Sequence, residues 1–531
     1  MVRATFSGFN TALSALQANQ KRLDITGQNL SNMNTAGYTR QQLEASSLNY
    51  TNPVSHYSNG NETAVGFGVS MDRVSQIRDP YLDIQYRSQS ADCSYTNRLQ
   101  TALNSLSKVL DETTISGIRQ AFDDIQSTLT SMQDPAKVSD PIYESELRTK
   151  MQSVCNLFNQ ASRQITQAEQ NEFQRLTGEG SSEQGDVQKI NDILRQIGDL
   201  NVQIKRNQVA GHPSLELQDE RNLLLDELSG YIPVETRYYK DDAHSGNNAY
   251  DYDANGAVIG KKDWPDDRLT KNYGQLSMLK GDHQTAASVS DPANISIKFE
   301  KAPSYQGNGQ AATNDVYAEL KGIRFEGGSL QASLDMLQKT GTGNVINGST
   351  AVDDVRGYQY YSEKLDQLAL TFAESMNKIN NGNKNPKDQN LLSNSTDDST
   401  TGITAGNIGI SKGWTSGTIH ISTDGTNRTD TILDMIAAMK DTKKLNGKTF
   451  ADYMNNLSTQ LASDSSSNQT ALKTGTTVLN SIQDSRDSLS GVSLDEEATN
   501  MMAYVSAYNA ASRLMTALDE VLNTLISNTG A

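Results

Sequence analysis

The sequence predicts a mainly α-helical protein with an inserted β-rich domain: a terminal α-helical coiled coil, an elongated helical bundle and β-rich outer structure. Both ends carry apolar residues at alternating three- and four-residue steps, which is the spacing of a coiled-coil seam. Apolar residues at helical spacing recur through most of the chain before Ile232. After Ile232 the composition turns to Gly, Asn, Asp and Tyr with short alternating runs, which is typical of strands.

The two terminal stripes are the most informative feature of the chain. The stripe near the start comprises Phe6, Phe9, Leu13, Leu16, Leu23 and Leu30, with Gln20 and Gly27 in the same register. The stripe near the end comprises Met501, Tyr504, Tyr508, Met515, Leu518, Leu522 and Leu525, with Ala511 in the same register. Each stripe is narrow, so neither helix can bury it alone, and each helix is expected to be marginal in water. We therefore expect the two ends to pair, an arrangement that suits assembly better than catalysis.

The elements of the first half follow in order. A helix should run from Phe6 to Met33 and end in a polar, glycine-containing turn at residues 32–38, before short strands and loops up to residue 71. Asp79-Pro80 opens a second helix, because proline suits a first turn. Helical stripes continue at 99–110, 118–132, 143–165, 187–204 and 223–228, with a loop at 177–185. These stripes indicate the core of an elongated helical bundle rather than cofactor sites.

The second half alternates strand-like and helical stretches. Residues 235–325 should form a β-rich insert, in which Ile295 to Phe299 alternates apolar and polar side chains. Helix should return at 330–337 and 358–379, followed by a second strand-like stretch at 403–421. Helix resumes near Ile432 and runs to the end with a serine-rich break at 464–468. The last helix should begin at a capping box, Ser493-Leu494-Asp495-Glu496.

These patterns suggest a division into domains. We expect a paired terminal coiled-coil domain from residues 1–45 and 490–531, and an elongated helical domain from 46–234, 326–381 and 430–489. Residues 235–325 should form the inserted β-rich outer domain. A short strand-like segment at 382–429 should associate with the outer or the helical domain.

Composition and charge restrict the possible partners. The chain of 531 residues has a formal net charge of -17 and no basic cluster, which argues against nucleic acid or an anionic membrane surface. No run approaches the roughly 20 apolar residues of a membrane span. The start has no h-region of a cleaved signal peptide. The only cysteines, Cys93 and Cys155, have no metal-ligand spacing; buried free thiols are favoured, and a disulfide stays open.

No catalytic or metal-binding motif stands out. The histidines, His56, His212, His244, His283 and His420, are scattered, and no zinc-protease, nucleophile-elbow, P-loop or dinucleotide fingerprint occurs. Asp251 to Gly256 resembles the first half of a calcium loop, but Lys262 stands where a bidentate glutamate is needed. Asn255-Gly256 between alternating residues favours a β-hairpin turn instead. We therefore expect no cofactor, no metal and no catalytic residue.

Residues at both ends resemble a known family. Asn29-Leu30-Ser31-Asn32-Met33-Asn34-Thr35-Ala36-Gly37-Tyr38 is similar to the N-terminal signature of flagellar rod, hook and hook-associated proteins. The extension Thr39-Arg40-Gln41 resembles the hook-associated members at the junction of hook and filament. The blocks 490–498 and 508–513 are similar to the C-terminal signature, and 217–229 to the second helical domain. Residues 235–325 match nothing specific in that family.

The resemblance implies a non-enzymatic structural subunit that joins the flagellar hook to the filament outside the cell. It implies unfolded export through the type III apparatus without a cleaved signal peptide, and folding on assembly. The implied partners are copies of the chain in a ring, the hook protein, a neighbouring hook-associated protein and an export chaperone bound to the C-terminal region. The family turn motif falls on Asn29, Asn32, Asn34, Gly37, Tyr38 and Arg40. Its asparagines either form turn or inter-subunit hydrogen bonds or simply end the helix.

Three other interpretations stay open. The chain could be a hook or distal-rod protein, against which Tyr38-Thr39-Arg40 and the 217–229 block speak. The insert at 235–325 could also act as a surface adhesin or glycan binder. An enzyme hidden in the insert is disfavoured, because no convergent His, Cys or carboxylate cluster is visible there.

Overall fold

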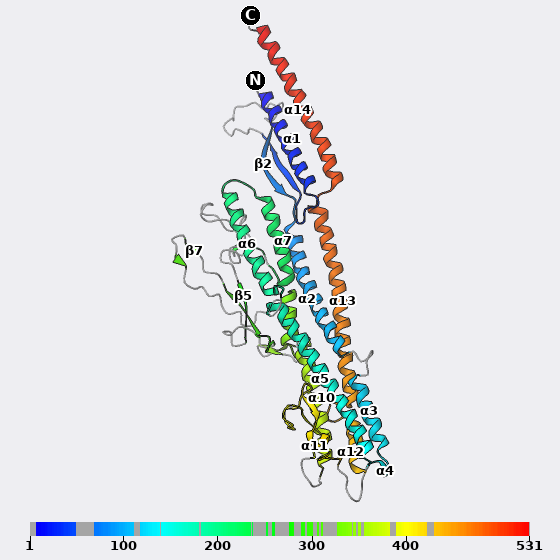
Figure 1. The fold of residues 1–531 in the computed structure, drawn as a ribbon. Helices are drawn as coiled ribbons and strands as arrows, with labels where there is room; N and C mark the ends of the chain where they lie inside the picture. Colours follow the sequence, from blue (N-terminus) through cyan, green and yellow to red (C-terminus); the bar gives the residue numbers. More distant parts are fainter. Residues whose placement is uncertain are drawn as a thin grey trace.

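The computed structural model is elongated and mainly helical, with both chain ends at the same end of the molecule (Figure 1). It describes residues 7–48, 68–110, 117–138, 140–179, 182–234, 236, 251–252, 258–260, 275–280, 288–292, 295–300, 305–306, 310–311, 327–341, 344–346, 349–351, 355–382, 389–421 and 429–529. The predicted fold class, mainly α with small β content, is confirmed.

Four elements form what we call the terminal unit. Helices α1 (Ser7–Ser31) and α14 (Leu494–Thr529) lie side by side, and strands β1 (Gln41–Ser47) and β2 (Val69–Gln76) pack next to α1 (Figure 1). The strands pair antiparallel, with an irregularity between Glu44 and Ala45. Strand β2 therefore packs with α1, as β1 does. The division into domains stays a prediction.

The remaining helices form what we call the body. They are α2 (Pro80–Leu110), α3 (Ile118–Ser131), α4 (Pro135–Val138), α5 (Pro141–Thr177), α6 (Asp186–Val209), α7 (Leu215–Tyr231), α9 (Gly328–Gln338), α10 (Tyr358–Asn381), α11 (Lys412–Ser416), α12 (Asp430–Met439) and α13 (Phe450–Ser490). Helix α13 runs along α2, and α2 also packs against α7 and α9. The part of the body next to the terminal unit is thus thin, because it consists mainly of α2, α6, α7 and α13 (Figure 1).

Local sequence explains where the long helices begin and end. The carboxylate of Asp140 accepts a hydrogen bond from the backbone N–H of Ile142, and Pro141 occupies the first turn of α5. The same helix ends at Gly178, whose φ of 75° is left-handed and whose N–H bonds back to the carbonyl of Gln174. Helix α6 starts at Asp186, so the predicted loop at 177–185 is confirmed.

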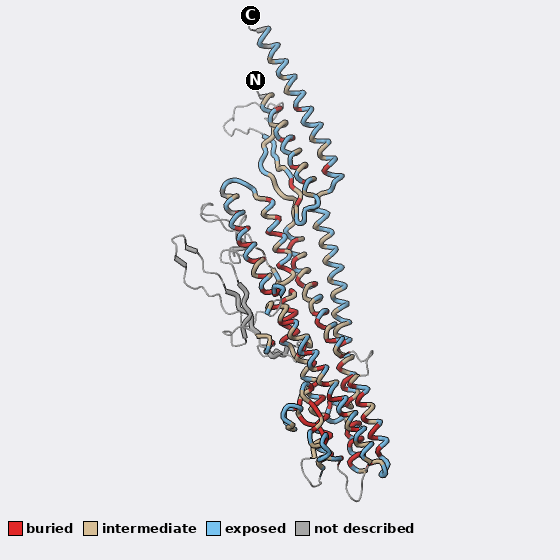
Figure 2. Tube along the Cα trace, in the orientation of Figure 1, coloured by how far each residue is buried: buried red, intermediate tan, exposed pale blue. Residues whose placement is uncertain are grey.

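The apolar core is densest in the part of the body farthest from the chain ends and extends to residues of α6 and α7 (Figure 2). At its centre the ring of Phe122 packs edge-on against Phe158 and Phe372 and stacks on Phe450. These rings come from α3, α5, α10 and α13, so one aromatic cluster ties together four helices distant in sequence. Among the described residues, this core takes no member from α1, β1, β2 or α14.

The predicted break at 464–468 is wrong, because α13 is continuous from Phe450 to Ser490. The polar residues of this stretch face α2 and hydrogen-bond to it. The amide of Asn468 donates to the carbonyl of Thr96 at 2.8 Å, and Gln100 donates to the hydroxyl of Ser465 at 2.7 Å. Tertiary contacts therefore override the weak helix propensity of serine and asparagine.

The predicted strand-like stretch at 403–421 is also wrong in most of its length. Only Ile408–Ile410 (β12) is a strand there, paired antiparallel with Leu392–Asn394 (β11), and it is followed by the short helix α11. The apolar residues that suggested a strand are instead buried in the core of the body. They are Ile403, Ala405, Ile408, Trp414 and Ile421.

The β-rich segment between α7 and α9 contains antiparallel strand pairs. They are β3 (Asp251–Tyr252) with β4 (Val258–Gly260), β5 (Gln275–Lys280) with β6 (Ile295–Glu300), and β7 (Tyr305–Gln306) with β8 (Gln310–Ala311). A further pair, β9 (Asn344–Ile346) with β10 (Ser349–Ala351), follows α9. The β3–β4 pairing fits the predicted hairpin, although its turn, with Asn255-Gly256, lies outside the described residues.

Both cysteines are free and buried, Cys93 on α2 and Cys155 on α5. Burial raises the pKa of the Cys155 thiol to about 12, so this thiol is inert near neutral pH. Over the described ranges, no helix is both long and apolar enough to cross a membrane.

Candidate functional site

The predicted stripe on α1 is only partly covered by its neighbours. Phe9, Leu16, Leu23 and Leu30 are half-buried, Leu13 is exposed, and Phe6 lies outside the described residues. The most buried residues of α1 are instead mostly small or polar, with one large apolar residue, Ile25; the others are Ala12, Ala18, Asn19, Thr26 and Asn29. Helix α1 packs against two neighbours, α14 and the β1–β2 pair. Its buried face is therefore wider than a coiled-coil stripe, and its most buried positions lie next to the predicted leucines rather than on them.

The predicted stripe on α14 coincides with its less exposed face. Ala511 is buried, and Met501, Tyr504, Met515, Leu518 and Leu522 are half-buried, whereas Tyr508 is 37% exposed. The side chain of Leu525 is not among those described. Contacts between the helices include Leu518 beside Gly8 and the guanidinium of Arg22 over the ring of Tyr504. The structure thus brings the two ends together along this face, while other apolar side chains of α14, such as Met502, Leu514 and Val521, remain exposed.

The turn motif lies where α1 ends, next to the start of α2 and α14. Asn29 is 1% exposed, and its amide makes three hydrogen bonds. Its Nδ2 donates to the carbonyl of Gln41 at 3.0 Å, and its Oδ1 accepts from the Gln41 N–H at 3.0 Å and the Tyr38 hydroxyl at 2.9 Å. Asn29 therefore fastens the end of α1 to the first residue of β1.

The other asparagines of the motif have local positions. The Nδ2 of Asn32 donates to the carbonyl of Gln28 within the last turn, its Oδ1 accepts from the hydroxyl of Thr35, and Asn34 is exposed. Gly37 has a φ of 77°, and a Cβ there would lie 3.3 Å from that of Leu223, so glycine is favoured both by conformation and by space. Asn29 is thus an interior hydrogen-bonding residue, whereas Asn32 serves helix termination.

Asn29→Ala should destabilise the terminal unit by about 2 kcal/mol, because the buried N–H and C=O of Gln41 lose their partner. Asn32→Ala removes only an exposed local bond and should change stability by less than about 0.5 kcal/mol. Amide exchange of residues 25–31 and 41–47 measures both. Equal effects of the two substitutions would contradict this distinction between the asparagines.

Thr39 connects the turn to the body. Its N–H and its hydroxyl both donate to the carboxylate of Asp219 on α7, at 3.0 and 2.6 Å. Burial raises the pKa of Asp219 to about 6, against the opposing effect of the Thr39 donors and Arg78. Burial, together with the charges of Glu216, Asp219 and Glu497, raises the pKa of Tyr38 to about 12, so its hydroxyl remains a donor to Asn29.

Arg40 connects the turn to α14. Its Nε lies 2.7 Å from the carboxylate of Glu497, which is 2% exposed, and its Nη1 lies 2.6 Å from Glu496. The backbone N–H of Arg40 donates to the carbonyl of Ser490 at the end of α13. The predicted capping box is half realised: Ser493 accepts from the N–H of Glu496 at 3.5 Å, but the carboxylate of Glu496 binds Arg40.

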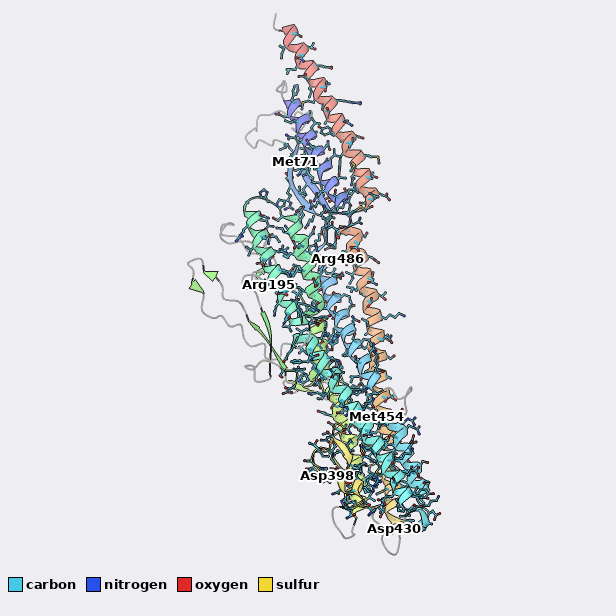
Figure 3. The ribbon with its side chains drawn as sticks, in the orientation of Figure 1. Met71, Arg195, Asp398, Asp430, Met454 and Arg486 are labelled. Atoms are coloured by element: carbon cyan, nitrogen blue, oxygen red, sulfur yellow. The ribbon has the colours of Figure 1, made fainter. Side chains whose placement is uncertain are left out.

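Alternating aspartates and arginines continue the network into the body. Arg78 binds Asp83 and lies 3.8 Å from Asp219, and Arg486 lies 3.1 Å from Asp83 and 2.7 Å from Asp226. Arg87 also binds Asp226, at 2.7 Å. The Arg486 guanidinium stacks on the ring of Tyr86, 4.3 Å from its centroid. Figure 3 shows Arg486 near the upper end of α13, just below the terminal unit.

We call this region the joint: the turn at 32–40, the starts of α2, α7 and α14, and the end of α13. A cleft of about 750 Å³ lies there, lined among others by Tyr38, Arg40, Arg486 and Glu496. Most of its charged groups, including Arg40, Glu496 and Arg486, are in ion pairs, which suits structural cohesion rather than proton transfer. In the part of the chain that the structure describes, no three His, Cys, Asp or Glu side chains group as metal ligands would.

The sequence pattern missed most of the joint. Only Gly37, Tyr38 and Arg40 of the predicted motif line its cleft, and the sequence did not predict their contacts with α7 and α14. Asp219, Asn222 and Asp226 lie in the block 217–229, at spacings of three and four residues that place them on one face of α7. This polar stripe within a leucine-rich helix was the sequence signal from which a polar contact at α7 could have been predicted.

Three family profiles match the chain in sequence order. Residues 9–39 match the flagella basal body rod protein family, residues 103–389 the flagellar hook-associated protein FlgK helical domain, and residues 485–528 the flagellar basal body rod FlgEFG protein C-terminal family. The two terminal matches contain most of α1 and its turn, and most of α14. The terminal unit is therefore similar to a wider group of flagellar proteins, and the body to one member of it.

Relatives of known name agree with these profiles. The chain is 30% identical to flagellar hook-associated protein 1 of Bacillus subtilis, over 99% of each chain. It is 29% identical to the protein of that name from Salmonella typhimurium, over 43% of this chain and 38% of the relative. The solved structure of the flagellar hook junction protein FlgK from Burkholderia pseudomallei aligns with a TM-score of 0.36 and 20% identity, over 59% of this chain and 45% of that one.

Proposed function

The chain belongs to the flagellar hook-associated protein 1 family, and we propose on that premise that it is a structural subunit joining the hook to the filament. The family assigns it to the flagellum, in contact with other axial components. The match at 103–389 and the relative aligned over 99% of its length favour this function over a hook or distal-rod protein.

One observation supports the proposal most: residues near the two ends of the chain form one unit that stands outside the core of the body. Such a unit can enter an axial tube while the body stays outside it. Exposed apolar side chains on α14, including Met502, Leu514 and Val521, give it surface to bury against neighbours. Burial of that surface stabilises the assembled state by roughly 25 cal/mol per Å² of apolar area.

The proposal includes specific partners. Copies of the chain in a ring would cover the exposed face of α14, and the hook protein and a neighbouring hook-associated protein would contact the ring from either side. An export chaperone would shield the same C-terminal helix before secretion, because that helix carries exposed apolar residues. Export would precede folding and deliver the protein outside the cell.

We further propose that the protein is not an enzyme. Most charged groups of the joint are in ion pairs and lie between structural elements. A catalytic acid or base needs access to a substrate, which fully paired side chains do not have. A structural role for the family fits this arrangement.

Deleting the gene tests the junction role. Mutant cells should keep bare hooks and release flagellin monomers, and the full chain supplied in trans should restore filaments. A version ending before Leu494 lacks α14 and should not restore them. Normal filaments in the deletion strain would show that the junction role is wrong.

The terminal unit should open locally in the isolated protein. Its fully buried apolar residues are few and mostly small, namely Ala12, Ala18, Ile25 and Ala511. We expect amides of α1 and α14 to exchange at least 100-fold faster than those of α5, and to gain protection on assembly. Protection of residues 9–30 equal to that of α5 in the isolated protein would contradict folding coupled to assembly.

A further inference from the structure

The contact between the terminal unit and the body is polar. Among the described residues, the core of the body runs from Leu99 to Leu461 and includes none of α1, β1, β2 or α14. The chain crosses from one part to the other at Ile77–Asp79 and at Ser490–Ser493. With no shared apolar core, the relative position of the two parts depends on these crossings and on the hydrogen bonds beside them.

Most of these hydrogen bonds end on the start of α7. Asp219 accepts from the N–H and the hydroxyl of Thr39, the amide of Gln41 donates to Glu216 at 3.3 Å, and Gln76 donates to the carbonyl of Leu215 at 3.0 Å. Three residues of the terminal unit and its turn, Thr39, Gln41 and Gln76, are thus held by polar groups within residues 215–219, about the first turn of one helix. The first turns of α7 are the docking surface.

Ion pairs with α2 and α13 fix the position of this part of α7 in the body. Arg78, itself bound to Asp83, lies 3.8 Å from Asp219, and Asp226 further along α7 binds both Arg87 and Arg486. Asp83 and Asp226 are therefore linked through Arg486, which fixes α2, α7 and α13 to one another at the joint. The acceptors that face the terminal unit are consequently preorganised.

The contact between the terminal unit and α7 also contains two serine hydroxyls whose burial destabilises it. Ser75 and Ser214, neighbours of Gln76 and Leu215, have buried hydroxyls without a hydrogen-bond partner. Ser214 also adopts a left-handed conformation, with a φ of 51°. Separation of the two parts would hydrate both hydroxyls, so the docked state is favoured by a limited margin.

We propose that the first turns of α7 form a latch that docks the terminal unit on the body through Thr39, so that α1 and α14 open together when the latch is released. While Asp219 holds Thr39, residues 38–41 keep their fold, and Arg40 can bind Glu496 and Glu497 on α14. Release removes the support of the turn from both α1 and α14 at once. The latch rests on the proposed junction role for its biological use, but its contacts do not depend on that role.

Amide exchange of the full-length protein tests the latch. Asp219→Ala leaves the buried N–H and hydroxyl of Thr39 without an acceptor, and should speed exchange in α1, β1 and α14 together by roughly 10- to 100-fold. Exchange in α3, α5 and α10 should not change. Asp192→Ala is the matched control, because Asp192 pairs with Arg195 on the same helix, α6, away from the joint.

Thr39→Val is the second variant, since it keeps the shape of the side chain and removes only its hydroxyl. It should speed the same amides by a smaller factor, so the test stands even if Asp219→Ala unfolds α7. Exchange unchanged by both variants, or faster in α1 without α14, would overturn the latch. Neither result would bear on the proposed junction role, because filament growth in the deletion strain tests that role separately.

Discussion

Arg40→Gln should make α14 and the turn at 32–40 open far more readily than in the native protein. The substitution leaves Glu497, which is 2% exposed, as a buried carboxylate without its cation. Breaking a buried ion pair from one side costs about 3–5 kcal/mol, and because Arg40 is 18% exposed we expect the lower end, about 3 kcal/mol. Amide exchange of residues 494–510 measures this as an increase of roughly 100-fold.

The matched control for Arg40 is Arg73→Gln. Arg73 pairs with Glu44 across β1 and β2, and both side chains are solvent-exposed, so the pair should contribute less than about 1 kcal/mol. If the two substitutions changed exchange in α14 equally, the importance of the buried pair between the turn and α14 would be disproved.

Phe122→Ala should destabilise the body by about 4 kcal/mol. The ring contacts Phe158, Phe372 and Phe450, and its removal leaves a cavity between four helices that cannot close without moving all of them. Urea unfolding followed by tryptophan fluorescence measures the change, because Trp414 is fully buried in the same core. Phe122→Leu refills most of the volume and should cost clearly less.

The same substitution also tests whether the two parts are independent. The core around Phe122 contains no residue of the terminal unit, so exchange in α1 and α14 should be unchanged at urea concentrations where the body remains folded. A loss of protection in α1 and α14 as large as that in α5 would show a shared core and contradict the polar joint.

Periodicity predicted the helical elements well, because it reports which side of a helix is apolar. On α14 the stripe from Met501 to Leu522 is the less exposed face. On α1 the prediction was less accurate, because one helix surface is shared by α14 and two strands and the most buried positions are Ala12, Ala18 and Ile25. The spacing of a coiled-coil stripe assumes one partner helix, whereas α1 packs against both α14 and the β1–β2 pair.

The missed features depend on contacts that are remote in sequence. Helix α13 continues through Ser465 and Asn468 because Gln100 and Thr96 on α2 satisfy their side chains. The joint depends on pairs such as Thr39 with Asp219 and Arg40 with Glu497, which lie far apart along the chain. The family resemblance covered both members of each pair in separate blocks, but only the fold shows that they contact each other.

The central claim is that the two ends of the chain pair with each other in the assembled flagellum. Cysteines introduced at Gly8 and Leu518 test it, since a Cβ at Gly8 would lie 3.4 Å from the Leu518 side chain. A short bismaleimide should link them within one chain in purified hook–filament junctions. The pair Gly8 with Ser527 should link poorly, because Ser527 lies about 14 Å further along α14 at 1.5 Å per residue. Equal yields for the two pairs, or no link within a chain, would contradict the claim.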